Sequence, residues 1–162
     1  IGIGIFIMRN KRSLQDIYAP KSICFGCGPL NENGLKIKSY KHKDGLKMSF
    51  HPKKEHQAFP GVLNGGIIGT LFDCHGNWTA AMYIFESNNK KKFPSTVTAS
   101  FEVKLLKPTP IDTKVEIFSQ IVTSTNDKAK VELELFSKNE ICAKSEGVFI
   151  SVKEGHPAFY RW

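Results

Sequence analysis

One carboxylate in this sequence stands where a charge is unexpected. Asp73 lies within residues 64–85, whose apolar side chains recur at three- and four-residue spacings with few charges between them. This spacing predicts a helix, and the scarcity of charge predicts that the helix is buried on most sides. Burial would raise the pKa of Asp73 and make it a better base, able to activate a water or to attack a carbonyl. The alternative is a structural Asp that is hydrogen-bonded to the backbone or to His75.

Two glycines, Gly65 and Gly66, stand at the expected start of the same helix. Backbone N–H groups in the first turn of a helix have no partner within it, and the positive end of the helix dipole lies there. Because glycine has no side chain, a ligand oxygen can approach these groups, which suits an oxyanion. Gly66 and Asp73 are two turns apart and lie near one stripe of the helix, separated by about 10 Å. The glycines could equally serve only a tight turn and close packing.

The four cysteines offer a second possible chemistry. The segment Cys24-Phe-Gly-Cys27-Gly has the form of a zinc knuckle, but a structural zinc needs four ligands and no second Cys-x-x-Cys is present. Cys74, Cys142 and the histidines could complete a site only if the fold gathers them. We therefore expect no metal and no cofactor. Uneven cysteine spacing without an export signal favours free thiols in a reducing compartment, with the cytoplasm as the default.

Composition limits the remaining possibilities. A chain of 162 residues with 41% apolar residues can form one domain with one core. A net charge of +8 favours anionic partners that carry phosphate. The positive charge is dispersed, and no recognition-helix pattern or RNP-like motif is present, so we expect no nucleic acid partner. The apolar run at residues 1–7 is too short to span a bilayer, which predicts no membrane span.

The elements that would position Asp73 follow from the spacing of apolar residues. Two short alternating runs, 35–40 and 46–50, flank an Asp44-Gly45 pair that suits a hairpin turn. After the helix, apolar residues alternate in four further runs, at 97–105, 115–121, 131–135 and 141–152. The natural arrangement of a hairpin, one apolar helix and four antiparallel strands is a curved sheet wrapped around the helix. The expected class is α+β with a hotdog fold.

Domain boundaries are expected at both ends of this pattern. Residues 1–22 lack a clear period and are predicted to form a loosely attached arm, in which 1–7 would precede a translation start at Met8. Residues 23–155 would form the hotdog domain, and residues 156–162 would form a C-terminal tail.

A family resemblance adds to this interpretation. Residues 59–80, which run from Phe-Pro-Gly-Val-Leu-Asn-Gly-Gly through Asp73 to Thr-Ala, resemble the signature of the PaaI-like hotdog thioesterases. That family has His-Gly-Gly, then an apolar helix, then a catalytic Asp or Glu. The likeness extends from Cys24 to Val152 and includes the run from Thr98 to Pro108.

The resemblance implies hydrolysis of an acyl-CoA thioester to the free acid and CoA. It implies that Asp73 is the general base or nucleophile, that the N–H of Gly65, with Gly66, polarises the thioester carbonyl, and that Thr98 positions water. It also implies a homodimer or a dimer of dimers, with the glycine turn of one subunit facing the acid of the other. Asn64 departs from the family's usual His; it can donate a hydrogen bond but cannot exchange a proton near neutral pH.

Three lysines are candidates for contacts with the phosphates of CoA. Thr98 and Lys104 are expected on one face of their strand, about 20 Å apart, so that a CoA tail could lie along it. Lys107 and Lys90 are the other two candidates. Solvated surface lysines are the alternative.

Two other functions remain open. A non-catalytic acyl-CoA-binding protein would explain Asn64. A hotdog enoyl-CoA hydratase would need a His near Asp73, but His75 lies about 200° away around the helix, so we expect it to contact some other group.

Overall fold

The apolar stretch that contains Asp73 forms the long helix predicted from its spacing. The structure is a computed structural model that describes residues 11–162. Helix α2 (Gly65–Ser87) begins after the N-cap Asn64 and ends before Asn88. Its buried residues cover nearly its whole circumference, with Leu71, Trp78 and Ile84 at 0% exposure. A helix apolar on all sides must be enclosed by other elements, and here a sheet and a loop enclose it.

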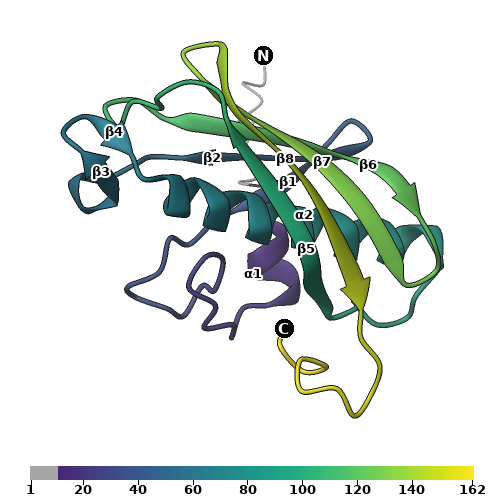
Figure 1. The fold of residues 1–162 in the computed structure, drawn as a ribbon. Coiled ribbons are helices and arrows are strands. Elements are labelled where there is room, and N and C mark those ends of the chain that lie inside the picture. The colour runs from purple at the N-terminus through teal and green to yellow at the C-terminus, as the bar shows by residue number, and fades with distance from the viewer. Residues whose placement is uncertain (1–10) are drawn as a thin grey trace, which may run out of the picture.

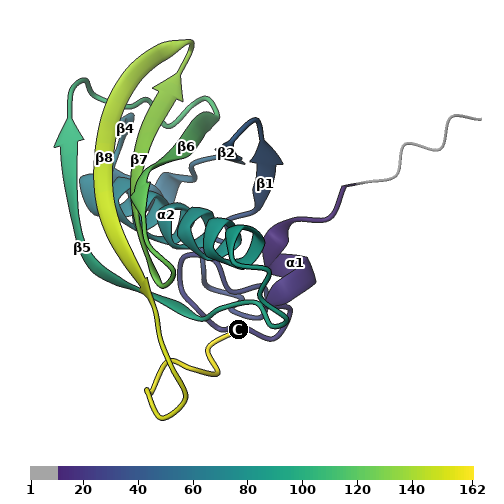
Figure 2. The ribbon, with the colours of Figure 1, turned by 90° about the vertical axis from the view of Figure 1, so that its right-hand side faces the viewer.

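A six-stranded antiparallel sheet curves around α2, in the order β1-β2-β6-β7-β8-β5 (Figures 1 and 2). Its strands are β1 (Ser39–His42), β2 (Gly45–Phe50), β5 (Thr96–Leu105), β6 (Val115–Ser124), β7 (Lys128–Ser137) and β8 (Glu140–Ser151). Alternate residues of β7, such as Val131, Leu133 and Leu135, are buried, as expected for a sheet with one covered face. This is the hotdog fold, which confirms the expected α+β class.

Three short elements were not predicted from the sequence. Helix α1 (Leu14–Tyr18), the 3₁₀ turn η1 (Lys54–His56) and the small hairpin of β3 (Gln57–Phe59) and β4 (Val62–Leu63) are each five residues or shorter. Such lengths are too short to show a hydrophobic period. The β3–β4 hairpin leads directly into α2 and so sets the direction of the glycine turn.

The first predicted strand starts later than expected. Residues 35–38 form a loop, and β1 begins only at Ser39. Lys36 has a positive φ of 51°, which is incompatible with a strand. Leu35 and Ile37 are nevertheless buried, and their N–H groups bond to the carbonyls of Phe25 and Gly26 in the preceding loop. The apolar alternation of this run therefore reflects packing against a loop.

The N-terminal arm is packed more tightly than the sequence suggests. Ser13 caps α1, and Gln15 is fully buried, with its amide bonded to the hydroxyl and backbone N–H of Ser39. The absence of a period at 11–22 therefore does not mean loose attachment, since buried hydrogen bonds hold this segment. Residues 1–7 and the suggested start at Met8 lie outside the described residues.

The C-terminal tail also packs against the domain. Arg161 donates to the carbonyl of Thr96 at 2.7 Å, and the indole of Trp162 donates to that of Pro94 at 2.7 Å. The Trp162 ring lies 4.4 Å from that of Trp78 on α2. Within the described part of the chain, no helix is both long and apolar enough to cross a membrane.

Candidate active site

A short chain of hydrogen bonds orients Asp73. The hydroxyl of Thr98 on β5 donates to Asp73 Oδ1 at 2.5 Å, and the amide of Asn77 donates to the same hydroxyl oxygen at 2.8 Å. Because a hydroxyl has one proton, the donation from Asn77 leaves the Thr98 proton directed at Asp73. Asn77 lies one helical turn after Asp73, so both face the same strand. The carboxylate is therefore fixed from its own helix and from β5.

Its surroundings favour the protonated form of Asp73 more than water does. Burial raises the pKa of Asp73 above its usual value, because removal from water penalises the charged form. The hydrogen bond from Thr98 and the positive charge of Arg161 act in the opposite direction without cancelling the rise. A half-buried carboxylate with a raised pKa is suited to accept a proton from water.

The first turn of α2 offers one free backbone donor. The side-chain oxygen of Asn64 accepts from the N–H groups of Gly66 at 2.7 Å and Ile67 at 3.3 Å. Among residues 11–162, no acceptor is present for the N–H of Gly65. Asn64 thus acts here as a helix cap through its oxygen. The donor left for a ligand oxygen is Gly65, whereas that of Gly66 is already engaged.

His75 faces the sheet, not the candidate site. It is fully buried, with Nδ1 2.8 Å from the Ser39 hydroxyl and Nε2 3.2 Å from the Ser119 hydroxyl. Burial lowers the pKa of His75 to about 3, so its ring is neutral at physiological pH. Both ring nitrogens are occupied by hydroxyl groups, as expected for a residue that contacts groups other than Asp73.

Comparison with solved structures identifies the family. A thioesterase superfamily protein from Shewanella loihica PV-4 is 32% identical, with a TM-score of 0.60, over 72% of this chain and 91% of that protein. The chain belongs to the thioesterase superfamily. This confirms the family resemblance and supports a thioester-hydrolase function in general. No protein-family sequence model matches the chain, and no curated protein matches it by sequence.

More distant members of the thioesterase superfamily share the fold. The PaaI protein of the E. coli phenylacetic acid degradation operon is 12% identical, with a TM-score of 0.60, and the match covers 74% of this chain and 81% of PaaI. A phenylacetic acid degradation-related protein from Ralstonia eutropha JMP134 is 14% identical, with a TM-score of 0.59, over 72% and 85% of the two chains. At these identities the likeness concerns the fold alone.

The expectation that Thr98 and Lys104 share one strand face is wrong. The pairing of β5 with β8 shifts register between Thr98 and Ser100, so Ala99 is an extra residue that reverses the alternation. Thr98 faces α2, whereas Lys104 lies beside Glu102 on the outer face of the sheet, away from the helix. A CoA tail that follows one face of β5 from Thr98 would not meet Lys104.

The other lysines lie at opposite ends of the domain. Lys107 pairs with Glu140 at 3.3 Å and lines a hollow next to Gly65. Lys90 lies beyond the C-terminal end of α2, beside a hollow that Phe159 of the tail also lines. The structure thus places Lys107 near the glycine turn and does not bring Lys90 near either Gly65 or Asp73.

An apolar hollow of ≈330 Å³ adjoins Gly65. Its lining includes Phe59, Ile68 and Leu105. The apolar α2 residues Phe72, Trp78 and Met82 do not line it, because they are buried in the core. The volume falls within the usual range for small-molecule sites.

Sequence reasoning missed two residues that act on Asp73. Asn77 had a detectable signal, since it is a polar residue four positions after Asp73 on an apolar helix. Arg161 had none, because it approaches Asp73 only through the fold of the C-terminal tail.

Proposed function

We propose that this chain hydrolyses an acyl-CoA thioester to a free acid and CoA, with Asp73 as general base or nucleophile. The observation that carries the proposal is the position of Asp73, a half-buried carboxylate on an apolar helix that Thr98 holds in one orientation. Such a carboxylate can deprotonate water at the carbonyl, or attack it directly. Gly65 supplies the N–H that stabilises negative charge on the thioester oxygen.

One chain does not contain both halves of this site. Gly65 and Asp73 are eight residues apart on α2, which corresponds to about 12 Å along the axis. An attacking group and an oxyanion donor must both lie about 3 Å from the reacting carbonyl. Gly65 must therefore act with the Asp73 of a second copy of the chain.

The edge strand β5 provides a way to join two copies. Within residues 11–162, β5 pairs with β8 on one side only, and Phe101 and Leu105 are 43% and 57% exposed. Thr98, near one end of β5, bonds to Asp73, and Leu105, at the other end, lies against Gly65. Antiparallel pairing of β5 with its copy about a two-fold axis near Phe101 would bring these opposite ends together. We propose this homodimer, which could pair further into a tetramer.

The hollow beside Gly65 is a suitable site for the acyl group. Its apolar lining would bind the acyl chain, and Lys107 on its rim would face an anionic part of the substrate. Gly66, Lys90 and Lys104 have less favourable positions, because Gly66 is bonded to Asn64 and the two lysines lie elsewhere on the domain.

The direct test is release of free thiol from a panel of acyl-CoAs. Asp73→Asn removes the base and should lower kcat by about 100-fold or more on any substrate that the parent cleaves. Asp112→Asn is the matched control, because Asp112 is an exposed acid that pairs with Lys138 on the surface. Equal rates for Asp73→Asn and the parent, or a panel that is not cleaved at all, would overturn the proposal.

The replacement of the family's usual His by Asn64 favours one second candidate. Asn64 cannot exchange a proton near neutral pH, so the site could bind acyl-CoA without turning it over. Calorimetric binding of an acyl-CoA without thiol release would establish this function instead.

A further inference from the structure

Three of the four cysteines meet beside α2. Cys24 and Cys27 come from the loop that precedes β1, and Cys74 is on α2 next to Asp73. The three sulfur atoms all lie within 4.8 Å of one another, and those of Cys24 and Cys74 are 3.8 Å apart. Cys27 and Cys74 are buried, whereas Cys24 is partly exposed. The fold has brought together thiols that are up to 50 residues apart in sequence.

The sulfur spacing matches that around a tetrahedral zinc ion. Zinc–thiolate bonds of about 2.3 Å at tetrahedral angles place two sulfur ligands about 3.8 Å apart. The Cys24 and Cys74 sulfurs already have this separation. A disulfide would need the same two sulfurs to approach to about 2.05 Å, and it would leave the third thiol unused.

The loop is shaped to direct its sulfurs inward. The backbone N–H of Gly28 donates to the carbonyl of Cys24 at 2.8 Å, which closes the turn that carries Cys24 and Cys27. Gly26 must lack a side chain, since its Cβ would lie 2.3 Å from the Cys74 sulfur. Hydrogen bonds from Leu35 and Ile37 to Phe25 and Gly26 hold the loop in place. These contacts fix the loop directly over Cys74.

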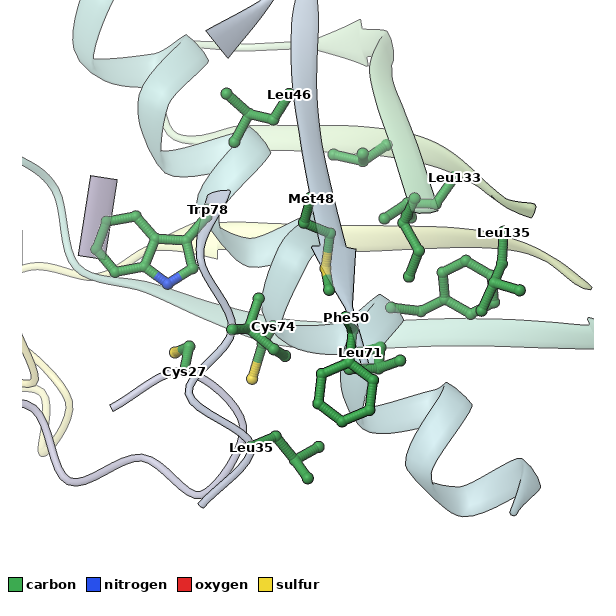
Figure 3. Close-up of a cluster of buried hydrophobic side chains, with 14 of the residues drawn as sticks. Cys27, Leu35, Leu46, Met48, Phe50, Leu71, Cys74, Trp78, Leu133 and Leu135 are labelled. Atoms are coloured by element: carbon green, nitrogen blue, oxygen red, sulfur yellow. The ribbon is translucent and has the colours of Figure 1, made fainter. Parts of the chain in front are cut away.

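Beside the three cysteines, the indole N–H of Trp78 is a buried hydrogen-bond donor without an acceptor in the described part of the chain. Trp78 is 0% exposed, and its indole N–H has no hydrogen-bond partner among residues 11–162. Figure 3 shows the indole nitrogen turned toward the Cys27 sulfur. A thiol is a weak acceptor, whereas a metal-bound thiolate is a strong one. A ligand ion at the cluster would therefore explain the orientation of this indole.

We propose that Cys24, Cys27 and Cys74 bind one zinc ion that ties the loop of residues 22–37 to α2. Thiolate sulfur is a donor that favours zinc, and the ion would neutralise most of the charge of three thiolates gathered in a half-buried place. No further His, Cys, Asp or Glu among the described residues joins the group. The fourth position, on the exposed side at Cys24, is left for water or a small thiol. This site does not depend on the proposed acyl-CoA hydrolysis.

Metal analysis of the full chain, purified without a metal-binding tag and in the presence of a reductant, tests the proposal. We expect about one zinc per chain by elemental analysis. Cobalt substitution of the unmutated chain should give sulfur-to-cobalt charge-transfer absorption in the near ultraviolet. Cys24→Ser and Cys74→Ser should lose most of the zinc, and chelation should lower the Tm of the parent by about 5 °C or more.

Cys142→Ser is the matched control, because Cys142 is a buried free thiol on β8 outside the cluster. It should retain the zinc and the cobalt spectrum. The cobalt measurement needs no variant, so it decides the question even if the serine variants fail to fold. The proposal is overturned if the reconstituted parent holds no zinc, if it shows no sulfur–cobalt absorption, or if two of the three cysteines form a disulfide.

Discussion

At the residue scale, α2 carries two ionisable side chains that are close in sequence but have different environments. Asp73 is half-buried at the β5 side of the helix, where Thr98 and Arg161 support its charged form. His75 is two positions later, about 200° around the helix, and is enclosed by hydroxyl groups beneath the sheet. The first is placed for chemistry and the second for a buried polar network, so we expect substitutions to separate activity from stability.

His75 should make folding stability sensitive to acid. Its pKa is lowered from 6.5 to about 3 by burial, so below pH 6.5 the unfolded chain binds a proton that the folded chain does not. Stability from this residue is complete above pH 6.5 and is lost as the pH falls toward 3, at about 1.4 kcal/mol per pH unit. We predict that urea unfolding of His75→Gln depends less on pH than that of the parent, by about 2 kcal/mol between pH 7 and pH 5.

His51→Gln is the control for this measurement, because His51 is exposed. It should keep the pH dependence of the parent. A His75→Gln protein with the same pH dependence as the parent would contradict the buried neutral state of His75.

At the element scale, the start of α2 combines a cap with an open donor. Asn64 satisfies the N–H groups of Gly66 and Ile67, which leaves Gly65 as the first free N–H of the helix. Asn is among the best N-cap residues, so its presence in place of the family's usual His has a structural reason. The first turn of α2, capped by Asn64, therefore presents the N–H of Gly65 at a fixed position.

Gly65→Pro tests that donor without breaking the helix. Proline lacks an N–H but is favoured at the first helical position, and the extended conformation of Asn64 (φ −63°, ψ 133°) is compatible with a following proline. We predict a fall in kcat of about 100- to 1,000-fold with little loss of stability. Gly65→Ala keeps the N–H, and its Cβ meets only the end of the Leu105 side chain, at 3.0 Å, so it should retain most activity. Similar activity of the two variants in a thiol-release assay would exclude the Gly65 donor.

At the scale of the whole molecule, the two halves of the site lie at opposite ends of β5. In the proposed dimer, each site takes Asp73 from one chain and Gly65 from the other. Two inactive variants with defects in different halves should therefore complement each other. In a mixed dimer, which contains one chain of each variant, one of the two sites would contain both defects and the other site would contain none.

Co-expression of Asp73→Asn with Gly65→Pro measures this complementation. Random pairing makes half of the dimers mixed, each with one intact site, which predicts about one quarter of the parent activity. If each chain forms its site alone, the mixture should show only the average of the two variants. The dimer itself can be checked by light scattering.

Much of the fold was predictable because its elements are long and regular. The runs at 46–50, 97–105, 115–121 and 131–135 all became strands, the last run did so over 141–151, and residues 65–85 fall within α2 after its N-cap Asn64. The run at 35–40 was assigned wrongly for most of its length, since a loop can bury alternate residues as a strand does. The extra residue Ala99 in β5 was also undetectable, because a bulge changes the pairing partner and not the composition.

The sequence by itself determined that a carboxylate lies on a buried apolar helix behind a glycine turn, because hydrophobic periodicity is a local property of the chain. Only the tertiary structure decided what surrounds that helix. It placed Thr98 against Asp73, the charge of Arg161 within electrostatic range of that carboxyl, His75 between two serines, and Cys74 against the loop of Cys24 and Cys27. These contacts join residues that are distant in the sequence, and no local pattern encodes a distance in space. Asp73 was therefore found from the sequence and Thr98 from the family resemblance, whereas the contribution of Arg161 and the thiol cluster required the fold.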